Sequence, residues 1–285
     1  MKYAIEIKKL VKNYPGFSLN IDELKIPSGA IIGLIGENGA GKTTLIKTIL
    51  NIIKKEEGTI KIFNKDSQKE ELLVKEDIGV VLDNAFFPEI LNAKNIDSIM
   101  QSIYKEWDSN LFYKYLKKFN IKDDQVLKTM SKGMRKKVEI ATALSHHPKL
   151  LILDEATSGL DPIMRNEVLD LFLDFIKDDE HTVILSTHIT SDLEHVADYI
   201  VFIDNGKIFL NQPMDEIINN YGILKCDLAL FDKIEKNDIV TYRKNKYSYD
   251  VLVNDKKNCK KKYKDFVIDN ITLEDLMVLI IKGGK

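Results

Sequence analysis

Arginine and cysteine are scarce in this chain, and each scarcity excludes a class of protein. Only three of the 42 basic residues are arginines, namely Arg135, Arg165 and Arg243. Few guanidinium groups mean few bidentate contacts to guanine or phosphate, and the net charge is −2, so no nucleic-acid partner is expected. The two cysteines, Cys226 and Cys259, form no C-x-x-C pair, so neither a zinc site nor a redox motif is indicated.

Long apolar runs are also missing. No uninterrupted apolar stretch reaches about 18 residues, the length that indicates a transmembrane helix. The first ten residues alternate apolar and charged side chains, a pattern that predicts a strand rather than a signal peptide. Hydrophobic residues still make up 44% of the 285 positions, enough for a large core. We therefore expect one large domain with at most a small appendix, and no segment that spans a membrane.

Strand and helix patterns alternate along most of the chain, which predicts an α/β fold with a mostly parallel core sheet. Residues 1–12 predict an edge strand, and the apolar run 30–35 is typical of a buried parallel strand. From about 84 to 145, apolar side chains recur at helical spacing and predict a helical insertion. We expect a main domain over 1–215 and a small appendix of unknown role over 216–285.

A glycine-rich segment from Gly36 to Thr43 matches the phosphate-binding pattern G-x-x-x-x-G-K-[ST] between a buried strand and a helix. Glycines let backbone N–H groups turn toward a phosphate, and the helix N-terminus adds partial positive charge. The Lys42 ammonium can reach the β- and γ-phosphates of ATP, and the Thr43 hydroxyl can ligate Mg²⁺. The residues expected at the nucleotide are Gly36, Asn38, Gly39, Ala40, Gly41, Lys42, Thr43 and Thr44.

Chemically active side chains follow two further apolar strands. Asp154 and Glu155 come directly after the run 150–153. Asp154 is expected to hold Mg²⁺, and Glu155 to polarise the attacking water as general base. His188 follows the strand 183–185 and is expected to face the γ-phosphate, although a lone histidine is more often structural. Taken alone, an acidic pair could equally be a solvated strand end; the phosphate-binding loop favours the catalytic interpretation.

A second anion-binding segment is indicated by the small residues of Ser131-Lys132-Gly133-Met134, which precede a predicted helix. An ordinary helix start, with Ser131 as the N-cap, is the alternative.

The order of these motifs resembles that of the ATP-binding subunits of ABC transporters, and within that family the exporters of the ABC-2 type from Gram-positive bacteria. Walker A corresponds to 36–43, the signature loop to 131–134, Walker B to 150–155 and the D-loop to 158–161, with His188 as the switch histidine. The resemblance covers about residues 1–215. It implies a P-loop NTPase fold in which an antiparallel β subdomain and a helical insertion accompany the core sheet.

Further site residues follow from the resemblance. Tyr14 stands where the family places an aromatic ring on adenine, and Asp161 lies in the D-loop. Ser131 and Gly133 are implied to contact ATP held by a second subunit. The usual Q-loop glutamine is absent, and Asp83 stands in its place, where it is expected to reach Mg²⁺.

The implied protein hydrolyses ATP in a head-to-tail homodimer or heterodimer and drives a separate transmembrane permease. It would lie in the cytoplasm, bound peripherally to the membrane through that permease. Phe86 and Phe87 are expected to dock the permease, with pinning of the insertion to the sheet as the alternative. An ABC-type ATPase of ribosomes or DNA, and a nucleotide sensor, are the other functions considered. A small-molecule kinase is disfavoured by the few arginines.

Overall fold

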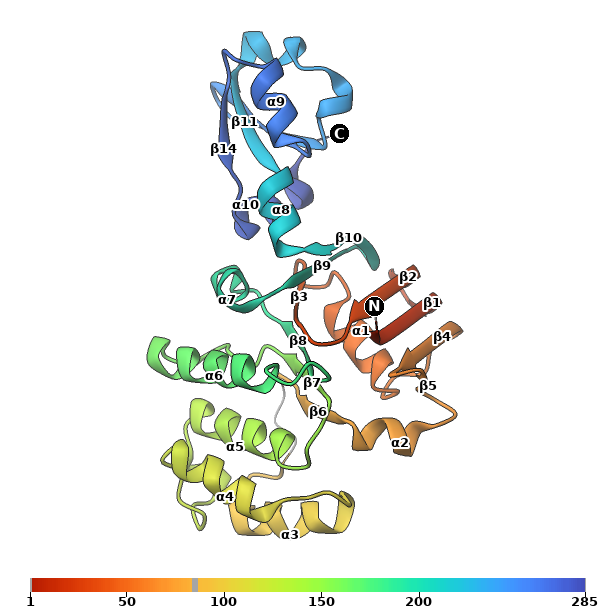
Figure 1. Cartoon of the computed structure of the whole chain (residues 1–285), viewed down its shortest axis with the longest axis vertical. Helices are drawn as coiled ribbons and strands as arrows, with labels where there is room; N and C mark the ends of the chain where they lie inside the picture. Colours follow the sequence, from red (N-terminus) through yellow and green to blue (C-terminus); the bar gives the residue numbers. More distant parts are fainter. Residues whose placement is uncertain (1, 84–86, 285) are drawn as a thin grey trace. The chain divides into compact units, whose positions relative to one another are not determined.

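The structure is a computed structural model that describes residues 2–83 and 87–284. The chain divides into two compact units, residues 1–197 with 201–209 and residues 198–200 with 210–285 (Figure 1). This division falls between residues 209 and 210. The domain boundary at 215 stays a prediction.

A six-stranded sheet in the order β10-β9-β3-β8-β7-β6 lies mainly in the first unit. Its strands are β3 (Ile31–Ile35), β6 (Ile78–Val81), β7 (Leu150–Asp154), β8 (Thr182–Ser186), β9 (Tyr199–Asp204) and β10 (Lys207–Pro213). Parallel pairing joins β3 to β8, β8 to β7 and β7 to β6. Every residue of β3, β7 and β8 is buried, as continuous apolar runs require. The predicted parallel core sheet is thus confirmed.

A second sheet in this unit is antiparallel, with the order β2-β1-β4-β5. It consists of β1 (Tyr3–Tyr14), β2 (Phe17–Pro27), β4 (Glu57–Ile62) and β5 (Lys65–Asp66). Because β1 pairs with both β2 and β4, the prediction of an edge strand over 1–12 is wrong. Its alternating pattern reports one buried face and carries no information about the number of neighbours.

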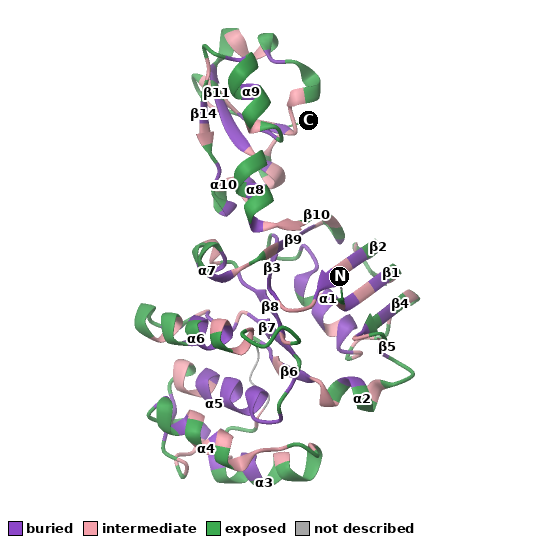
Figure 2. Ribbon diagram, in the orientation of Figure 1, coloured by how far each residue is buried: buried purple, intermediate pink, exposed green. Residues whose placement is uncertain are grey.

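Helices complete the first unit. They are α1 (Lys42–Ile49), α2 (Glu71–Glu76), α3 (Ala93–Ile103), α4 (Ser109–Lys118), η1 (Leu127–Thr129), α5 (Lys132–Leu144), α6 (Pro162–Phe175) and α7 (Thr190–Val196). The predicted helical insertion contains α3, α4 and α5. Figure 2 shows that α5 is buried along most of its length, and it packs with α4 around the fully buried Phe112.

The second unit has its own sheet, in the order β12-β13-β11-β14, and its neighbouring strands pair antiparallel. Its elements are α8 (Met214–Asn220), β11 (Gly222–Asp227), η2 (Leu228–Lys233), η3 (Lys236–Asp238), β12 (Thr241–Lys244), β13 (Ser248–Val253), α9 (Lys256–Lys262), β14 (Val267–Asn270) and α10 (Leu273–Lys282). Leu224, Val251 and Cys259 belong to its separate core. None of the helices in residues 2–83 and 87–284 has the length and apolar character needed to cross a bilayer.

Candidate nucleotide site

The glycine-rich loop joins β3 to α1, and glycine is required at two of its positions. Gly36 has φ 155°, and a Cβ there would lie 2.3 Å from the carbonyl oxygen of Ile203. Gly41 has φ 114°, and a Cβ there would lie 2.9 Å from Cζ of Phe17. A side chain at either position would meet both a left-handed backbone and a neighbouring atom. The sequence therefore specifies the tight backbone path that a phosphate-binding loop needs.

The Lys42 side chain lies inside this loop. It is 7% exposed, and its Nζ donates hydrogen bonds to the carbonyl oxygens of Gly36 at 2.7 Å and Glu37 at 3.2 Å. Burial lowers the pKa of the Lys42 ammonium, while the carboxylates of Glu155 and Asp154 oppose that shift. The loop thus positions one cation next to two acidic groups.

Two acidic residues leave the carboxyl end of β7. Asp154 is 2% exposed, and the Thr43 hydroxyl donates a hydrogen bond to its Oδ2 at 2.9 Å. Glu155 has φ 53°, an uncommon value for a residue other than glycine, and its N–H donates to the Ser186 carbonyl at 2.8 Å. This backbone bond to β8 holds Glu155 in place.

His188 contacts Glu155 directly. Its Nδ1 lies 2.7 Å from Glu155 Oε2, and its side chain is 58% exposed while that of Glu155 is 18% exposed. Since β7 and β8 are adjacent parallel strands, their carboxyl ends bring these side chains together. The structure therefore places the two residues predicted to act on water and γ-phosphate within hydrogen-bond distance.

A cavity of about 260 Å³ lies over this group. Its lining residues are Phe17, Asn38, Gly39, Gly41, Lys42, Thr43, Thr44, Asp83, Asp154 and Glu155. Asp83, which replaces the usual glutamine, is among them. Gly36 and Ala40 do not line the cavity, and Ala40 is buried behind the loop, where its carbonyl accepts a hydrogen bond from the Gly206 N–H at 2.9 Å.

Phe17 is the lining residue that sequence reasoning missed. It faces Tyr14 across the β1–β2 hairpin as its Cα partner. Tyr14 is 41% exposed, has the Lys12 ammonium 5.3 Å from its ring centroid, and does not line the cavity. The missed signal is an aromatic residue directly after the Pro15-Gly16 turn.

The predicted residues of the signature loop and the D-loop lie outside the lining of this cavity, as does His188. Ser131 caps α5 by accepting a hydrogen bond from the Met134 N–H at 3.2 Å. Asp161 caps α6 by accepting bonds from the N–H groups of residues 163 and 164, both at 3.1 Å. Gly133 lies close to the D-loop, since a Cβ there would be 3.3 Å from Leu160 Cδ2. The signature loop and the D-loop of one chain thus lie together and apart from that chain's own P-loop cavity.

Comparison with known proteins shows the family. A family model described as ABC transporter matches residues 19–158. The lantibiotic transport ATP-binding protein SrtF of Streptococcus pyogenes is 33% identical over 225 residues, covering 76% of this chain and 96% of the relative. The bacitracin transport ATP-binding protein BcrA of Bacillus licheniformis is 34% identical over 221 residues, covering 76% and 72%.

The fold agrees. A solved structure of an ATP-binding subunit of an ABC transporter superposes with a TM-score of 0.68 at 25% identity, covering 75% of this chain and 91% of that one. The predicted mixture of a parallel core sheet, an antiparallel β sheet and a helical insertion is confirmed as that fold. The chain belongs to the family of ABC transporter ATP-binding subunits, which hydrolyse ATP and work with a membrane permease.

Proposed function

We propose that this ATPase binds Mg-ATP between two ATP-binding domains and powers an export permease by closing that pair. The observation that supports the proposal most directly is the division of the site. The P-loop cavity contains Lys42, Thr43, Asp154 and Glu155, whereas Ser131 of the same chain lies outside it. A second subunit, placed head to tail, would supply the missing signature loop to each cavity.

The oxygen ligands present fit a magnesium ion. Thr43 Oγ1 and Asp154 Oδ2 lie 2.9 Å apart, and Asp83 lines the same cavity. Hydroxyl and carboxylate oxygens are the donors that Mg²⁺ prefers, with phosphate oxygens completing its shell. Bound there, the ion would neutralise charge on the phosphates. Thr43 and Asp154 are the proposed ligands, with Asp83 acting directly or through water.

The protein side chains then divide the chemistry. Glu155 accepts a proton from the attacking water. His188 Nδ1 lies 2.7 Å from the Glu155 carboxylate and orients that carboxylate. Lys42 places its positive charge on the β- and γ-phosphates. Ser131 and Gly133 of the second subunit present the N-terminus of its α5 to the γ-phosphate. Closure of the pair completes both sites.

The permease is proposed to dock on a different cavity of the first unit, about 300 Å³ in volume, between β6 and the helical insertion. Phe87, Met100 and Tyr104 contribute to its apolar lining. Its polar members are Glu139, Thr142 and His146. Phe87 is half-buried and also packs on the insertion's core, so the pinning alternative stays open. Phe86 lies outside the described residues. Docking would hold the ATPase at the cytoplasmic face of the membrane.

A complementation experiment tests the shared site. Lys42→Ala removes the P-loop cation, and Ser131→Asp puts a negative charge where the partner's γ-phosphate would bind while keeping an N-cap residue. Each variant alone should be inactive. A mixture should recover about a quarter of the wild-type ATPase rate, because half of the random dimers carry one intact site of two.

The control is a mixture of wild type with Ser131→Asn, which preserves the cap without adding charge and should stay active. Full activity of Ser131→Asp alone would contradict a catalytic signature loop.

A further inference from the structure

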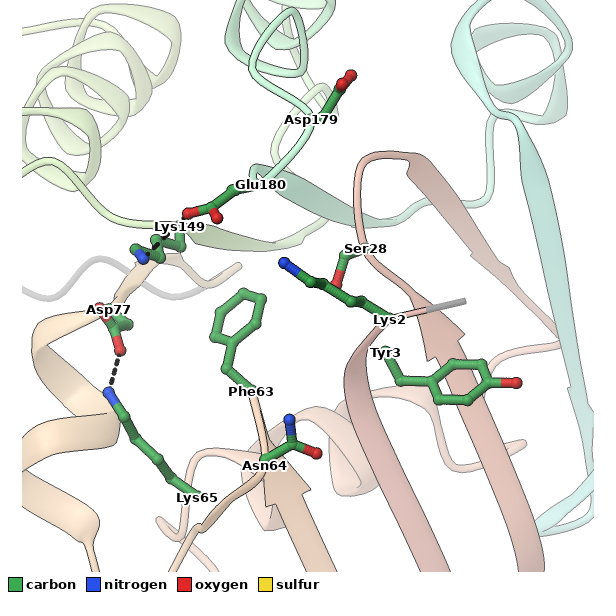
Figure 3. Close-up of a pocket in the computed structure, with 10 residues that line it drawn as sticks. All are labelled: Lys2, Tyr3, Ser28, Phe63, Asn64, Lys65, Asp77, Lys149, Asp179 and Glu180. Atoms are coloured by element: carbon green, nitrogen blue, oxygen red, sulfur yellow. Dashed lines mark hydrogen bonds and ion pairs between the residues drawn. The ribbon is translucent and has the colours of Figure 1, made fainter.

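A cavity of about 660 Å³ in the first unit lies away from the nucleotide site. It is lined by Ser28, Asp77, Lys149 and Glu180, which lie one to three residues before the starts of β3, β6, β7 and β8, respectively. It therefore opens at the amino ends of the parallel strands, whereas the Walker residues follow their carboxyl ends. No step of ATP hydrolysis uses it, and we name it the amino-end cavity (Figure 3).

The opposite wall contains a strained turn. Ile62 of β4 pairs with Lys65 of β5, which leaves Phe63 and Asn64 as a two-residue hairpin loop. Both have left-handed backbones, with φ 47° and 66°. Such turns favour Asn-Gly or Asp-Gly, and a bulky side chain with positive φ is uncommon. Nothing in the hairpin itself calls for phenylalanine.

The Phe63 side chain instead serves the cavity. Figure 3 shows the ring rising from the turn into the middle of the cavity, where it is half-buried. The turn is fixed by a hydrogen bond from the Phe63 N–H to the Ala4 carbonyl at 2.9 Å. Residues other than glycine with a left-handed backbone cluster at active sites and ligand clamps. A flat apolar group would stack on this ring.

Most of the charged groups around the ring are paired with one another. Lys65 pairs with Asp77 at 2.6 Å, and Lys149 pairs with Glu180 at 3.2 Å. The Lys2 ammonium points toward the cavity centre beside Phe63 and forms no ion pair or hydrogen bond within residues 2–83 and 87–284. Its backbone is anchored, because its carbonyl accepts from the Ser28 N–H at 3.1 Å. Asp179, the remaining acid of the lining, points away in the same view.

We propose that the amino-end cavity binds a planar aromatic molecule with one acidic group. Its ring would stack on Phe63, and its acidic group would accept a charge-assisted hydrogen bond from Lys2. The volume suits a small organic ligand. Among the described residues that line this cavity, Lys2 has the one unpaired ammonium, which favours an anion over a neutral or cationic molecule.

A matched pair of fluorescent probes tests both halves of the proposal on the full chain. 8-Anilinonaphthalene-1-sulfonate is a planar aromatic anion, and N-phenyl-1-naphthylamine has the same rings without the charge. Lys2→Gln should weaken sulfonate binding about tenfold and leave the amine unaffected. Phe63→Gly should weaken both probes, and it should retain the fold because glycine suits the left-handed turn. Lys61→Gln, an exposed lysine on β4 outside the cavity, is the matched control and should change neither.

The expected result is saturable sulfonate binding with one site per chain that depends on Lys2 and Phe63. Sulfonate affinity equal in the wild type and both cavity variants would overturn the proposal. Equal wild-type affinity for the sulfonate and the amine would also overturn it, because Lys2 would then select nothing.

Discussion

At the scale of single residues, two aromatic side chains lie near the nucleotide site, and the sequence alone does not show which of them lines the P-loop cavity. Tyr14 and Phe17 are direct partners across one hairpin, yet only Phe17 lines the P-loop cavity. Adenine stacking on Tyr14 stays a prediction, and Phe17 is an additional candidate for contact with the nucleotide.

Alanine substitution of each ring measures its contribution. If the ring stacks on adenine, Tyr14→Ala should weaken ATP binding by about 1–3 kcal/mol, taking base stacking in nucleic-acid complexes as the analogue. Phe17→Ala should also weaken binding, since its ring lies against the Gly41 backbone. Titration with a fluorescent ATP analogue gives both affinities. Wild-type affinity in Tyr14→Ala would show that Tyr14 is outside the site.

Asp83 is a second residue with a distinct consequence. It adds negative charge to the cavity that holds Asp154 and Glu155, so binding of ATP should require the metal strictly. Asp83→Gln should keep ATP binding and relax the dependence of turnover on Mg²⁺. The measurement is ATPase rate against Mg²⁺ concentration. Identical curves for variant and wild type would remove Asp83 from the metal site.

At the scale of secondary-structure elements, the helical insertion is held by its own buried groups. Asp97 on α3 accepts hydrogen bonds from Trp107 Nε1 at 2.8 Å and from the Ser109 hydroxyl at 2.6 Å. These bonds tie α3 to the start of α4, and Phe112 packs fully buried beneath them. The insertion can therefore stay folded while side chains on its cavity face change.

Because its own buried groups hold the insertion together, Phe87→Ala can distinguish permease docking from pinning of the insertion. If Phe87 docks the permease, the variant should lose about 1 kcal/mol of unfolding free energy or less, while ATPase stimulation by the permease disappears. Phe112→Ala is the matched core control and should lose about 3–5 kcal/mol. Thermal unfolding with and without the permease provides the comparison. A loss for Phe87→Ala as large as for Phe112→Ala would favour the pinning role.

Which elements could be predicted depends on how local their signals are. The P-loop and the Asp154-Glu155 pair come directly after apolar runs, and His188 lies two residues after β8. Chain order alone therefore indicates that these groups converge. Pairing across hairpins is not local, which is why the inner position of β1 and the lining role of Phe17 were missed. The strained Phe63 turn was also beyond prediction, because its left-handed backbone depends on tertiary contacts.

At the scale of the whole molecule, the proposed function requires two ATP-binding domains. Each chain holds a P-loop cavity and, separately, a signature loop beside its D-loop. In the proposed arrangement a second subunit completes each site, so ATP binding would be linked to association and hydrolysis to separation. A heterodimer with a different ATP-binding subunit fits this arrangement as well as a homodimer, since it would use the same P-loop cavity and signature loop.

The most direct test is the association state of Glu155→Gln. The amide cannot accept the proton of the attacking water, so ATP should bind and persist. Light scattering after size-exclusion chromatography in Mg-ATP should give twice the 32.7 kDa mass of the chain, and the single mass without nucleotide. The wild type, which turns ATP over, serves as control and should revert to the single mass as ATP is consumed. A Glu155→Gln protein with ATP bound that stays at the single mass, both alone and with its permease, would contradict the shared site.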